Sequence, residues 1–150
     1  MNYWLLKSEP GSYSIDDLQR QTKTPWDGVR NYQARNFMMK EMKVGDLAFF
    51  YHSNCKQIGI VGVCEVSSES YPDFTAFDQH DHHYDPKSSP EKPRWFMVDI
   101  KFRKKFKRVV SLEELKQTPA LDGMMILRKG NRLSITPIQE EHWQVVEEMV

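Results

Sequence analysis

The residues best suited to contact a ligand lie in one run from Trp26 to Asn36, Trp-Asp-Gly-Val-Arg-Asn-Tyr-Gln-Ala-Arg-Asn. An indole face can stack on a nucleobase, which contributes roughly 1–3 kcal/mol per stacked base. Amide side chains and the free N–H groups at the start of a helix can hydrogen-bond a base edge or a phosphate. A structural alternative is that Trp26 packs beneath the loop and Arg35 pairs with an acid, because aromatic residues near turns are usually core. The local sequence leaves both interpretations open.

One strongly basic run extends from Lys101 to Arg108, where six of eight residues are cationic and two are phenylalanines. If the run forms a strand, Lys101, Arg103 and Lys105 share one face, opposite the phenylalanines. Such a stripe suits a phosphate backbone, which cations bind by charge attraction and counterion release. The alternative is a strand edge on which charge prevents aggregation.

Residues 78 to 85, Asp-Gln-His-Asp-His-His-Tyr-Asp, contain three histidines and three carboxylates that could ligate zinc. The same groups can simply be solvated in a polar loop, and they show no regular ligand spacing. We therefore expect no metal and no other cofactor. The GxGxxG, P-loop, GxSxG, HExxH and CxxC motifs do not occur either. The sequence thus favours a binding module over an enzyme.

Length and composition limit the class of protein. A chain of 150 residues has the usual size of one domain, and 39% hydrophobic against 28% charged residues is ordinary for a globular protein. Basic and acidic side chains number 21 each, which excludes a strongly basic histone-like binder but not a local basic face. Cys55 and Cys64 predict no disulfide framework. Without a signal peptide or an apolar span, we expect a single domain, residues 1–150, acting as a monomer in the cytoplasm.

Capping signals locate the helices. Ser14, with an aspartate three residues later, predicts a helix over residues 15–21. A second helix is expected to begin at Asn31 and to continue to about residue 42, because apolar residues recur on one face. Ser111 begins another capping box, followed by a short helix. Thr136 followed by proline predicts the N-cap and first residue of a terminal helix.

Runs of apolar residues, either continuous or alternating with polar ones, predict five strands. They span residues 3–7, 47–52, 58–66, 95–106 and 132–136. Residues 67–93 form a long irregular excursion that is too aromatic for a disordered linker. Strands outnumber helices, and hairpins or short helices link them. The predicted fold class is therefore α+β, a small mixed or antiparallel β-barrel decorated by short helices.

Seven segments, in order along essentially the whole chain, resemble the EVE domain family. They are Tyr3–Pro10, Tyr13–Leu18, Trp26–Asn36, Phe49–Asn54, Tyr71–Asp73, Pro93–Asp99 and Arg132–Pro137. The resemblance implies a PUA-like β-barrel, related to the YTH domains that hold N6-methyladenine in an aromatic cage. It also implies a reader of modified bases, chiefly modified cytosine in DNA, or of RNA. Because the chain starts at the first strand, we expect a bacterial single-domain version of the family.

The resemblance also implies which residues bind the base. By analogy with the YTH arrangement, Trp26 is one wall of the cage, and Tyr84 is a candidate for another wall, with structural packing as its rival. Asn31, Arg35 and Asn36 would line the rim or contact phosphate. The remaining implied contacts lie at strand ends and in the loop after Trp26: Lys7, Ser8, Gly28, Tyr51, His52, Ser53, Arg132 and Ser134.

These features predict a non-catalytic module that binds nucleic acid and flips a modified base into a pocket walled by Trp26. Arg35 and the basic run would hold phosphates. One alternative is an RNA-binding accessory module that reads backbone and shape without modification specificity. Another is a nucleobase-modifying enzyme that uses His52 or the histidines between residues 80 and 83 as base or metal ligands. No membrane partner is expected.

Overall fold

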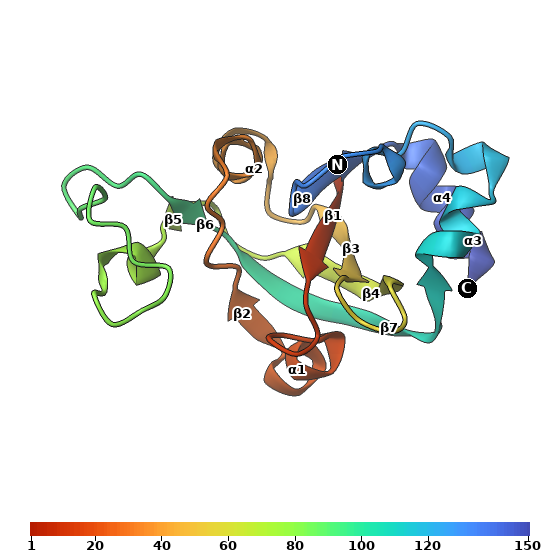
Figure 1. The fold of residues 1–150 in the computed structure, drawn as a ribbon, viewed down its shortest axis with the longest axis horizontal. Coiled ribbons are helices and arrows are strands. Elements are labelled where there is room, and N and C mark those ends of the chain that lie inside the picture. The colour runs from red at the N-terminus through yellow and green to blue at the C-terminus, as the bar shows by residue number, and fades with distance from the viewer.

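A curled six-stranded sheet forms the centre of the protein, whose computed structural model describes residues 1–150 (Figure 1). The strand order is β2-β7-β4-β3-β1-β8. These strands are β1 (Tyr3–Ser8), β2 (Lys23–Pro25), β3 (Leu47–His52), β4 (Gly59–Val66), β7 (Asp99–Ser111) and β8 (Ile135–Ile138). A separate two-stranded sheet pairs β5 (Tyr71–Pro72) with β6 (Phe96–Met97). The curled sheet with its short helices confirms the predicted α+β class.

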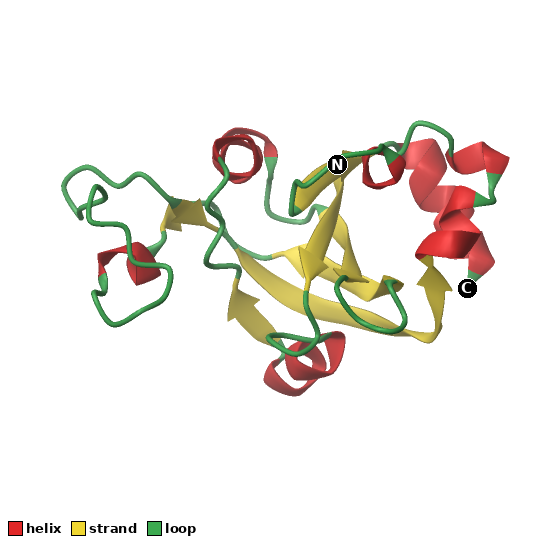
Figure 2. Ribbon diagram, in the orientation of Figure 1, coloured by secondary structure: helices red, strands yellow, loops and turns green.

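Short helices surround this sheet (Figure 2). The α-helices are α1 (Ile15–Gln21), α2 (Tyr32–Asn36), α3 (Leu112–Lys116) and α4 (Glu140–Met149). A π-helical turn, η1 (Phe37–Glu41), and three 3-10 turns, η2 (Phe74–Phe77), η3 (Pro119–Leu121) and η4 (Met125–Leu127), complete the set. In Figure 2, α3 and α4 lie together at one end of the molecule, while α1 and α2 lie below and above the strands. No helix has the length and apolar character needed to cross a bilayer.

Neighbouring side chains of the central strands enter two different cores. On one face of the sheet, Trp4 and Phe50 pack in a buried cluster with Trp26 and with residues of α1 and α2. On the other face, Leu5 and Phe49 pack in a second cluster with residues of α3 and α4. Successive residues of a strand point to opposite faces, so β1 and β3 contribute to both cores. Both faces of the sheet are therefore covered.

Local capping determines where two of the helices begin. The Asp17 N–H donates to Ser14 Oγ at 3.1 Å, and the Ser14 N–H donates to the Asp17 carboxylate at 2.9 Å. This reciprocal pair confirms the predicted helix over residues 15–21. The helix expected after Asn31 begins as predicted but changes after five residues into the π-helical turn η1, where the Met42 N–H donates to Phe37 O at 2.8 Å. The expected single helix is thus two different turns in succession.

The prediction for the C-terminal strand and helix is wrong in its boundary. Thr136 and Pro137, expected to cap and start the terminal helix, lie inside β8, and α4 begins after Gln139. β8 is an edge strand and has no neighbouring strand on its open side. A proline is tolerated in such a strand because its missing N–H removes no hydrogen bond between strands on that side. The main anchor of α4 is Trp143, which stacks on Phe49 with ring centroids 3.8 Å apart.

The strand predicted over residues 95–106 is in fact two strands in two sheets. Residues Phe96–Met97 pair with β5, whereas β7 starts at Asp99 and continues to Ser111. The predicted alternation fails at Met97, which is completely buried although its position in a single strand would have exposed it. The chain moves from one sheet to the other before Asp99. The alternation of side chains between the two faces therefore starts anew in β7. We call residues 67–97, which contain β5 and β6, the lobe; it extends to the left in Figure 1.

Candidate functional site

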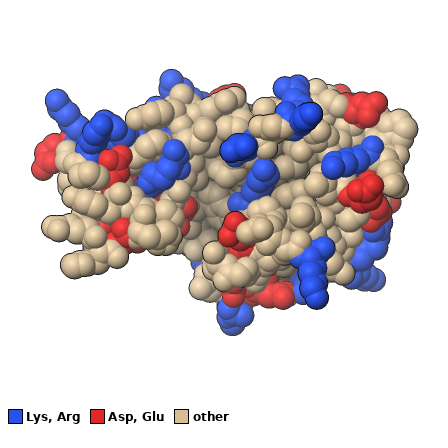
Figure 3. Space-filling model, in the orientation of Figure 1, with Lys and Arg blue, Asp and Glu red and all other residues tan.

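A hollow of about 620 Å³ lies between the lobe and the sheet. Figure 3 shows a hollowed surface between the two parts of the molecule. Its walls come from the end of β1, the start and end of α1, the loop between β2 and α2, the lobe, and the residue before β8. The lining residues are Lys7, Ser8, Glu9, Ser12, Tyr13, Gln21, Thr24, Pro25, Trp26, Asp27, Gly28, Val29, Arg30, Asp81, His82, His83 and Ser134. We call this hollow the Trp26 pocket.

A second hollow of similar size, about 670 Å³, lies where β4 begins and β7 ends. Its nine lining residues include no aromatic side chain. It therefore offers no ring on which a planar ligand could stack. The Trp26 pocket, which has two aromatic residues, is the candidate functional site.

Trp26 is both a core residue and a wall of the pocket. Its side chain is only 9% exposed, and its ring packs edge-on against Phe50 at 5.6 Å and against Tyr13 at 6.5 Å between centroids. Its indole N–H makes no hydrogen bond within the protein, yet it is not among the buried unpartnered atoms, which are the hydroxyls of Ser67 and Thr136. The indole N–H is therefore a free donor with access to solvent. Trp26 therefore packs in the core and also lines the pocket. Packing beneath the loop and binding a ligand do not exclude each other for this side chain.

Tyr13, not Tyr84, is the second aromatic residue of the pocket. Tyr84 is 41% exposed, in the turn after His83, and does not line the hollow. Tyr13 lines it with its ring perpendicular to that of Trp26, at 82°. The proposed cage role of Tyr84 therefore has no support in the geometry, because the turn leaves its side chain outside the pocket.

Four other residues implied by the family resemblance do meet in the Trp26 pocket: Lys7, Ser8, Gly28 and Ser134. The Lys7 N–H donates to Ser134 O at 2.9 Å, which joins the end of β1 to the entrance of β8. Partial burial lowers the pKa of Lys7 by desolvating its ammonium group. The hydroxyl of Ser8 donates to Tyr13 O at 2.5 Å and so holds the turn before α1 against β1.

The three residues expected at the rim make structural hydrogen bonds instead, and one of them, Arg35, joins α2 to the lobe. Asn31 caps α2 by accepting the Ala34 N–H at 3.0 Å. The Arg35 guanidinium donates to the Arg94 carbonyl at 2.8 Å and to Asn36 Oδ1 at 2.9 Å. None of the three lines the pocket. Their contact with a nucleic acid stays a prediction, since the Oδ1 atoms of Asn31 and Asn36 and the guanidinium of Arg35 already take part in structural hydrogen bonds.

The residues expected from the end of β3 also lie outside the pocket. Tyr51 is 2% exposed and belongs to the core on the opposite face from Trp26, because it follows Phe50 in the strand. Burial there raises the pKa of Tyr51 to about 12. His52 Nε2 accepts the N–H of Ile15 at 3.1 Å, which fixes the start of α1, and the Ser53 N–H donates to a carbonyl of β1. Their predicted contact with a base edge is therefore not supported.

The three cations of the basic stripe pair with two carboxylates. Lys101 and Arg103 both pair with Glu65, at 3.1 and 2.9 Å, and Lys105 pairs with Asp16 at 2.6 Å. The charged-edge alternative does not describe Lys101, because β7 pairs there with Lys23 of β2. A phosphate would have to compete with a carboxylate for each of the three cations, although exposed ion pairs like these are weak.

Asp27 is a pocket residue that the sequence reasoning passed over, although it stands next to Trp26. Its pKa is raised above the ordinary value, first because the pocket walls desolvate the carboxylate and then because the Asp73 and Asp81 carboxylates repel it. His83 opposes this shift. A carboxylate in such a place can accept a hydrogen bond from an exocyclic amine of a base.

Arg30 and Gly28 join the lobe to the pocket loop. Arg30 donates to His83 O at 2.8 Å and to Asp73 Oδ2 at 3.0 Å, and the Gly28 N–H donates to the same carboxylate oxygen at 2.8 Å. Gly28 has φ +79°, and a Cβ there would lie 2.5 Å from His83 Nε2. Only glycine fits this left-handed conformation against the imidazole without strain.

Asp81, His82 and His83 are the part of the predicted histidine-rich segment that comes together in space. Each offers one ligand atom, and these atoms lie within 4.8 Å of one another at the edge of the pocket. The Asp81 carboxylate is 3.3 Å from His83 Nδ1, while the His82 side chain is 84% exposed. Groups this open to solvent can also be simply hydrated, so the arrangement by itself favours neither alternative.

Comparison with known proteins places this geometry in a family. The model of the EVE domain matches residues 2–149. Thymocyte nuclear protein 1 of Rattus norvegicus is 48% identical over 163 residues, which cover 97% of this chain and 72% of the rat protein. A crystal structure from Pseudomonas putida has 46% identity and a TM-score of 0.95, covering 98% of both chains. The structure of human THYN1 protein in complex with 5-methylcytosine-containing DNA has 43% identity and a TM-score of 0.92, covering 99% of this chain and 97% of the human one.

Proposed function

This chain belongs to the EVE domain family, and we propose that it is a non-catalytic nucleic-acid-binding module that holds one modified base in the Trp26 pocket. The observation that carries the proposal is the pocket itself, which combines two aromatic rings, a free indole donor and the Asp27 carboxylate. The human relative in complex with 5-methylcytosine-containing DNA points to modified cytosine as the base. The proposed module is the whole of residues 1–150, because β1 and β3 contribute to both cores.

A cytosine derivative matches the polar groups of the pocket. Its exocyclic amine is a donor, which the Asp27 carboxylate can accept, and its ring nitrogen and carbonyl are acceptors. The indole N–H of Trp26 and the hydroxyl of Ser134 supply donors from other directions. A base can reach these groups only after leaving its stack, at a cost of a few kcal/mol that the pocket contacts must offset.

Catalysis has no comparable support in the geometry. His52 was the candidate general base, but its Nε2 accepts the Ile15 N–H, and desolvation lowers its pKa so that it stays neutral. The pocket contains no nucleophile with a base and an orienting group in hydrogen-bond contact. We therefore propose binding alone.

The decisive experiment measures the affinity of the protein for three oligonucleotides at one salt concentration. These are a DNA duplex with one 5-methylcytosine, the same duplex unmodified, and RNA of the same sequence. We expect the modified duplex to bind most tightly. Equal affinity for both duplexes, or tighter binding of RNA, would show that the module reads backbone and shape without regard to the modification. Mass spectrometry of the recovered modified DNA should show no turnover.

Binding of an amine-bearing base should weaken as the pH falls. Acidification through the raised pKa of Asp27 protonates its carboxylate, and the neutral carboxyl group then accepts from the amine more weakly than the charged one. Asp27→Asn should bind more weakly at neutral pH and should lose this part of the pH dependence. Fluorescence anisotropy from neutral to mildly acidic pH measures both effects. Asp122→Asn, a change at an exposed carboxylate outside the pocket, is the matched control and should follow the wild-type profile.

A further inference from the structure

We propose that the segment 128–132, Arg-Lys-Gly-Asn-Arg, is the site that binds the phosphodiester backbone next to the held base. We call this segment the basic loop; it connects η4 to β8. The inference rests on the proposed function, since the ligand is the nucleic acid whose base enters the Trp26 pocket. It replaces the stripe of Lys101, Arg103 and Lys105 as the phosphate contact.

The first observation is the local excess of positive charge. The chain has a formal net charge of zero, yet residues 123–139 contain no carboxylate and include Arg128, Lys129 and Arg132. All three are exposed, and none takes part in an ion pair. In the 101–108 run, by contrast, five of the six cations pair with a carboxylate. All three cations of the basic loop are therefore available to a ligand, whereas in the basic run only Lys107 has no carboxylate partner.

The second observation is that the basic loop has a defined shape. Gly130 adopts φ +80°, and the Asn131 N–H donates to Arg128 O at 3.2 Å, which closes a turn. The Asn131 side chain accepts the Leu133 N–H at 2.9 Å and donates to the carbonyl of Met125. Hydrogen bonds of Asn131 thus tie the loop to itself and to η4. A loop held in this way presents its cations with less loss of conformational freedom on binding.

The third observation is that the basic loop leads directly to the pocket. Ser134 lines the Trp26 pocket, and Arg132 precedes it by two residues, a chain length of at most about 7 Å. The Lys7 N–H donates to Ser134 O. The backbone of Lys7, which is another cation of the pocket, therefore lies beside the C-terminal end of the basic loop. The phosphates on either side of a base held in the pocket would therefore pass close to these side chains.

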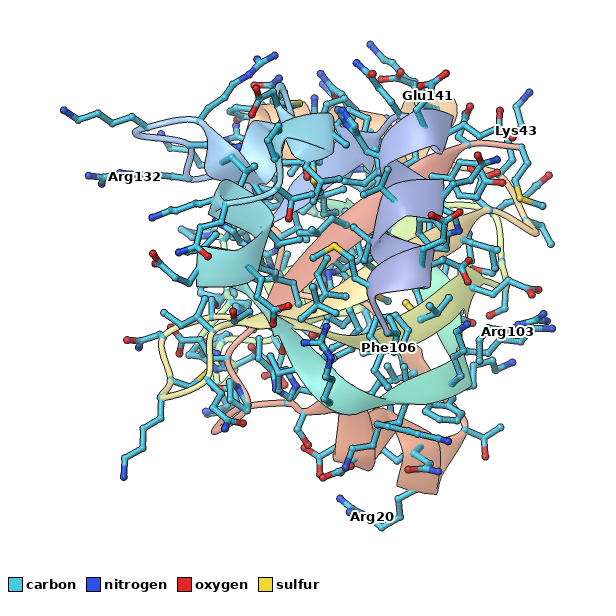
Figure 4. The ribbon with its side chains drawn as sticks, turned by 90° about the vertical axis from the view of Figure 1, so that its right-hand side faces the viewer. Arg20, Lys43, Arg103, Phe106, Arg132 and Glu141 are labelled. Carbon is cyan, nitrogen blue, oxygen red and sulfur yellow. The ribbon has the colours of Figure 1, made fainter.

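The orientation of Arg132 agrees with this path. Figure 4 is turned so that the right-hand side of Figure 1 faces the viewer, and Arg132 extends outward at its left edge, while Arg103 lies at the right. Arg132 thus points toward the viewer of Figure 3, on the face that shows the hollowed surface with several Lys and Arg side chains around it. Arg103 points to the other side of the molecule. A guanidinium can bind a phosphate through two parallel hydrogen bonds, and an ammonium adds a point charge.

The test compares two double variants that remove the same charge. One carries Lys129→Ala and Arg132→Ala in the basic loop. The control carries Lys40→Ala and Lys43→Ala, two exposed cations without ion pairs that lie in η1 and just after it, outside the Trp26 pocket. Affinities for the modified and the unmodified duplex are measured over a series of salt concentrations. Thermal melts confirm that both variants are folded, which is expected because all four side chains are exposed.

We expect the basic-loop variant to lose affinity for both duplexes equally, since phosphate contacts carry no base information. Its slope of log K against log salt should be smaller by about 1.8, because each phosphate contact in duplex DNA contributes about 0.9. Between about 50 and 200 mM salt, the wild type should then lose roughly 12-fold more affinity than the variant. The control should keep the wild-type slope.

Each other outcome overturns a distinct statement. A wild-type slope in the basic-loop variant, or an equal reduction in the control, would overturn the basic-loop site while leaving the base preference intact. A wild type that binds both duplexes equally would overturn the proposed function, and the slopes would still decide the basic-loop site. A wild type that binds neither duplex would overturn both.

Discussion

Trp26→Ala should remove most of the preference for the modified base. Loss of base stacking costs about 1–3 kcal/mol, which corresponds to roughly 5- to 150-fold in affinity. The variant also removes the free indole donor of the pocket. We expect the affinity for the modified duplex to fall to that for the unmodified duplex, measured by fluorescence anisotropy at fixed salt.

The same substitution should also lower the free energy of unfolding. Trp26 is 9% exposed and packs against Phe50 and Tyr13, and truncating a buried tryptophan costs about 3–5 kcal/mol. A loss of binding could therefore come from unfolding alone, so urea titrations must accompany the binding data. Binding is measured only under conditions where the variant remains folded.

Trp26→Phe separates the two effects. Phenylalanine keeps an aromatic face toward Phe50 and Tyr13 but has no N–H, so it should stay closer to the wild type in stability than alanine does. It should retain part of the preference for the modified base through stacking. If folded Trp26→Ala binds the modified duplex as tightly as the wild type does, Trp26 is only a core residue.

Local signals were sufficient to predict the elements around the pocket. The Ser14 capping box depends on residues three apart, so it could be identified without knowledge of the rest of the fold. The same holds for the apolar strands, because a buried strand is visible as a run of suitable side chains. Trp26 was found for a similar reason: an aromatic residue among turn residues is conspicuous.

The rest of the pocket depends on contacts between distant parts of the chain. Arg30 and Gly28 meet Asp73, and the walls formed by His83 exist only because the lobe folds back onto the loop after β2. No local pattern predicts such a contact. The contact of Arg35 with the Arg94 carbonyl could not be predicted for the same reason, since the two residues are 59 positions apart.

Charge patterns in the sequence give the number of cations but not their partners. The run that contains Lys101 and Arg103 looked more basic than the segment with Lys129 and Arg132. The fold places Glu65 on the neighbouring strand β4, opposite the first pair, and leaves the second pair without carboxylates. Free charge, not total charge, attracts a phosphate backbone, and it becomes visible only once the strands are paired.

Asp73→Asn should cause a large loss of stability, although Asp73 lies outside the central sheet. The Asp73 carboxylate is fully buried and accepts from the Thr75 N–H and hydroxyl, at 2.9 and 2.6 Å, and from the Gly28 N–H and the Arg30 guanidinium. An amide keeps the shape but turns one acceptor into a donor that faces other donors. Breaking a buried ion pair costs about 3–5 kcal/mol. We expect about 3 kcal/mol, because Arg30 is partly exposed and can regain water.

The loss should depend on pH in a defined direction. Burial alone would raise the pKa of Asp73, but the hydrogen bonds from Thr75, Gly28 and Arg30 outweigh it and lower the pKa. A carboxyl group with a lowered pKa stabilises the fold fully above its unfolded-state pKa, and this stabilisation disappears as the pH falls through the lowered value. The difference in unfolding free energy between the wild type and Asp73→Asn should therefore be largest at neutral pH and should shrink in acid. Urea titrations at several pH values measure it.

Asp78→Asn is the matched control, because Asp78 lies in the same lobe but is exposed and accepts only the local His80 N–H. It should change stability little at any pH. If Asp73→Asn is no less stable than this control, the carboxylate does not join the lobe to the pocket loop. If it is less stable, the base preference should weaken as well, because the variant disturbs the Asp73 hydrogen bonds that hold Gly28 and Arg30 to the lobe beside the His83 wall. Stability of the lobe and recognition of the base are thus expected to fail together in one variant.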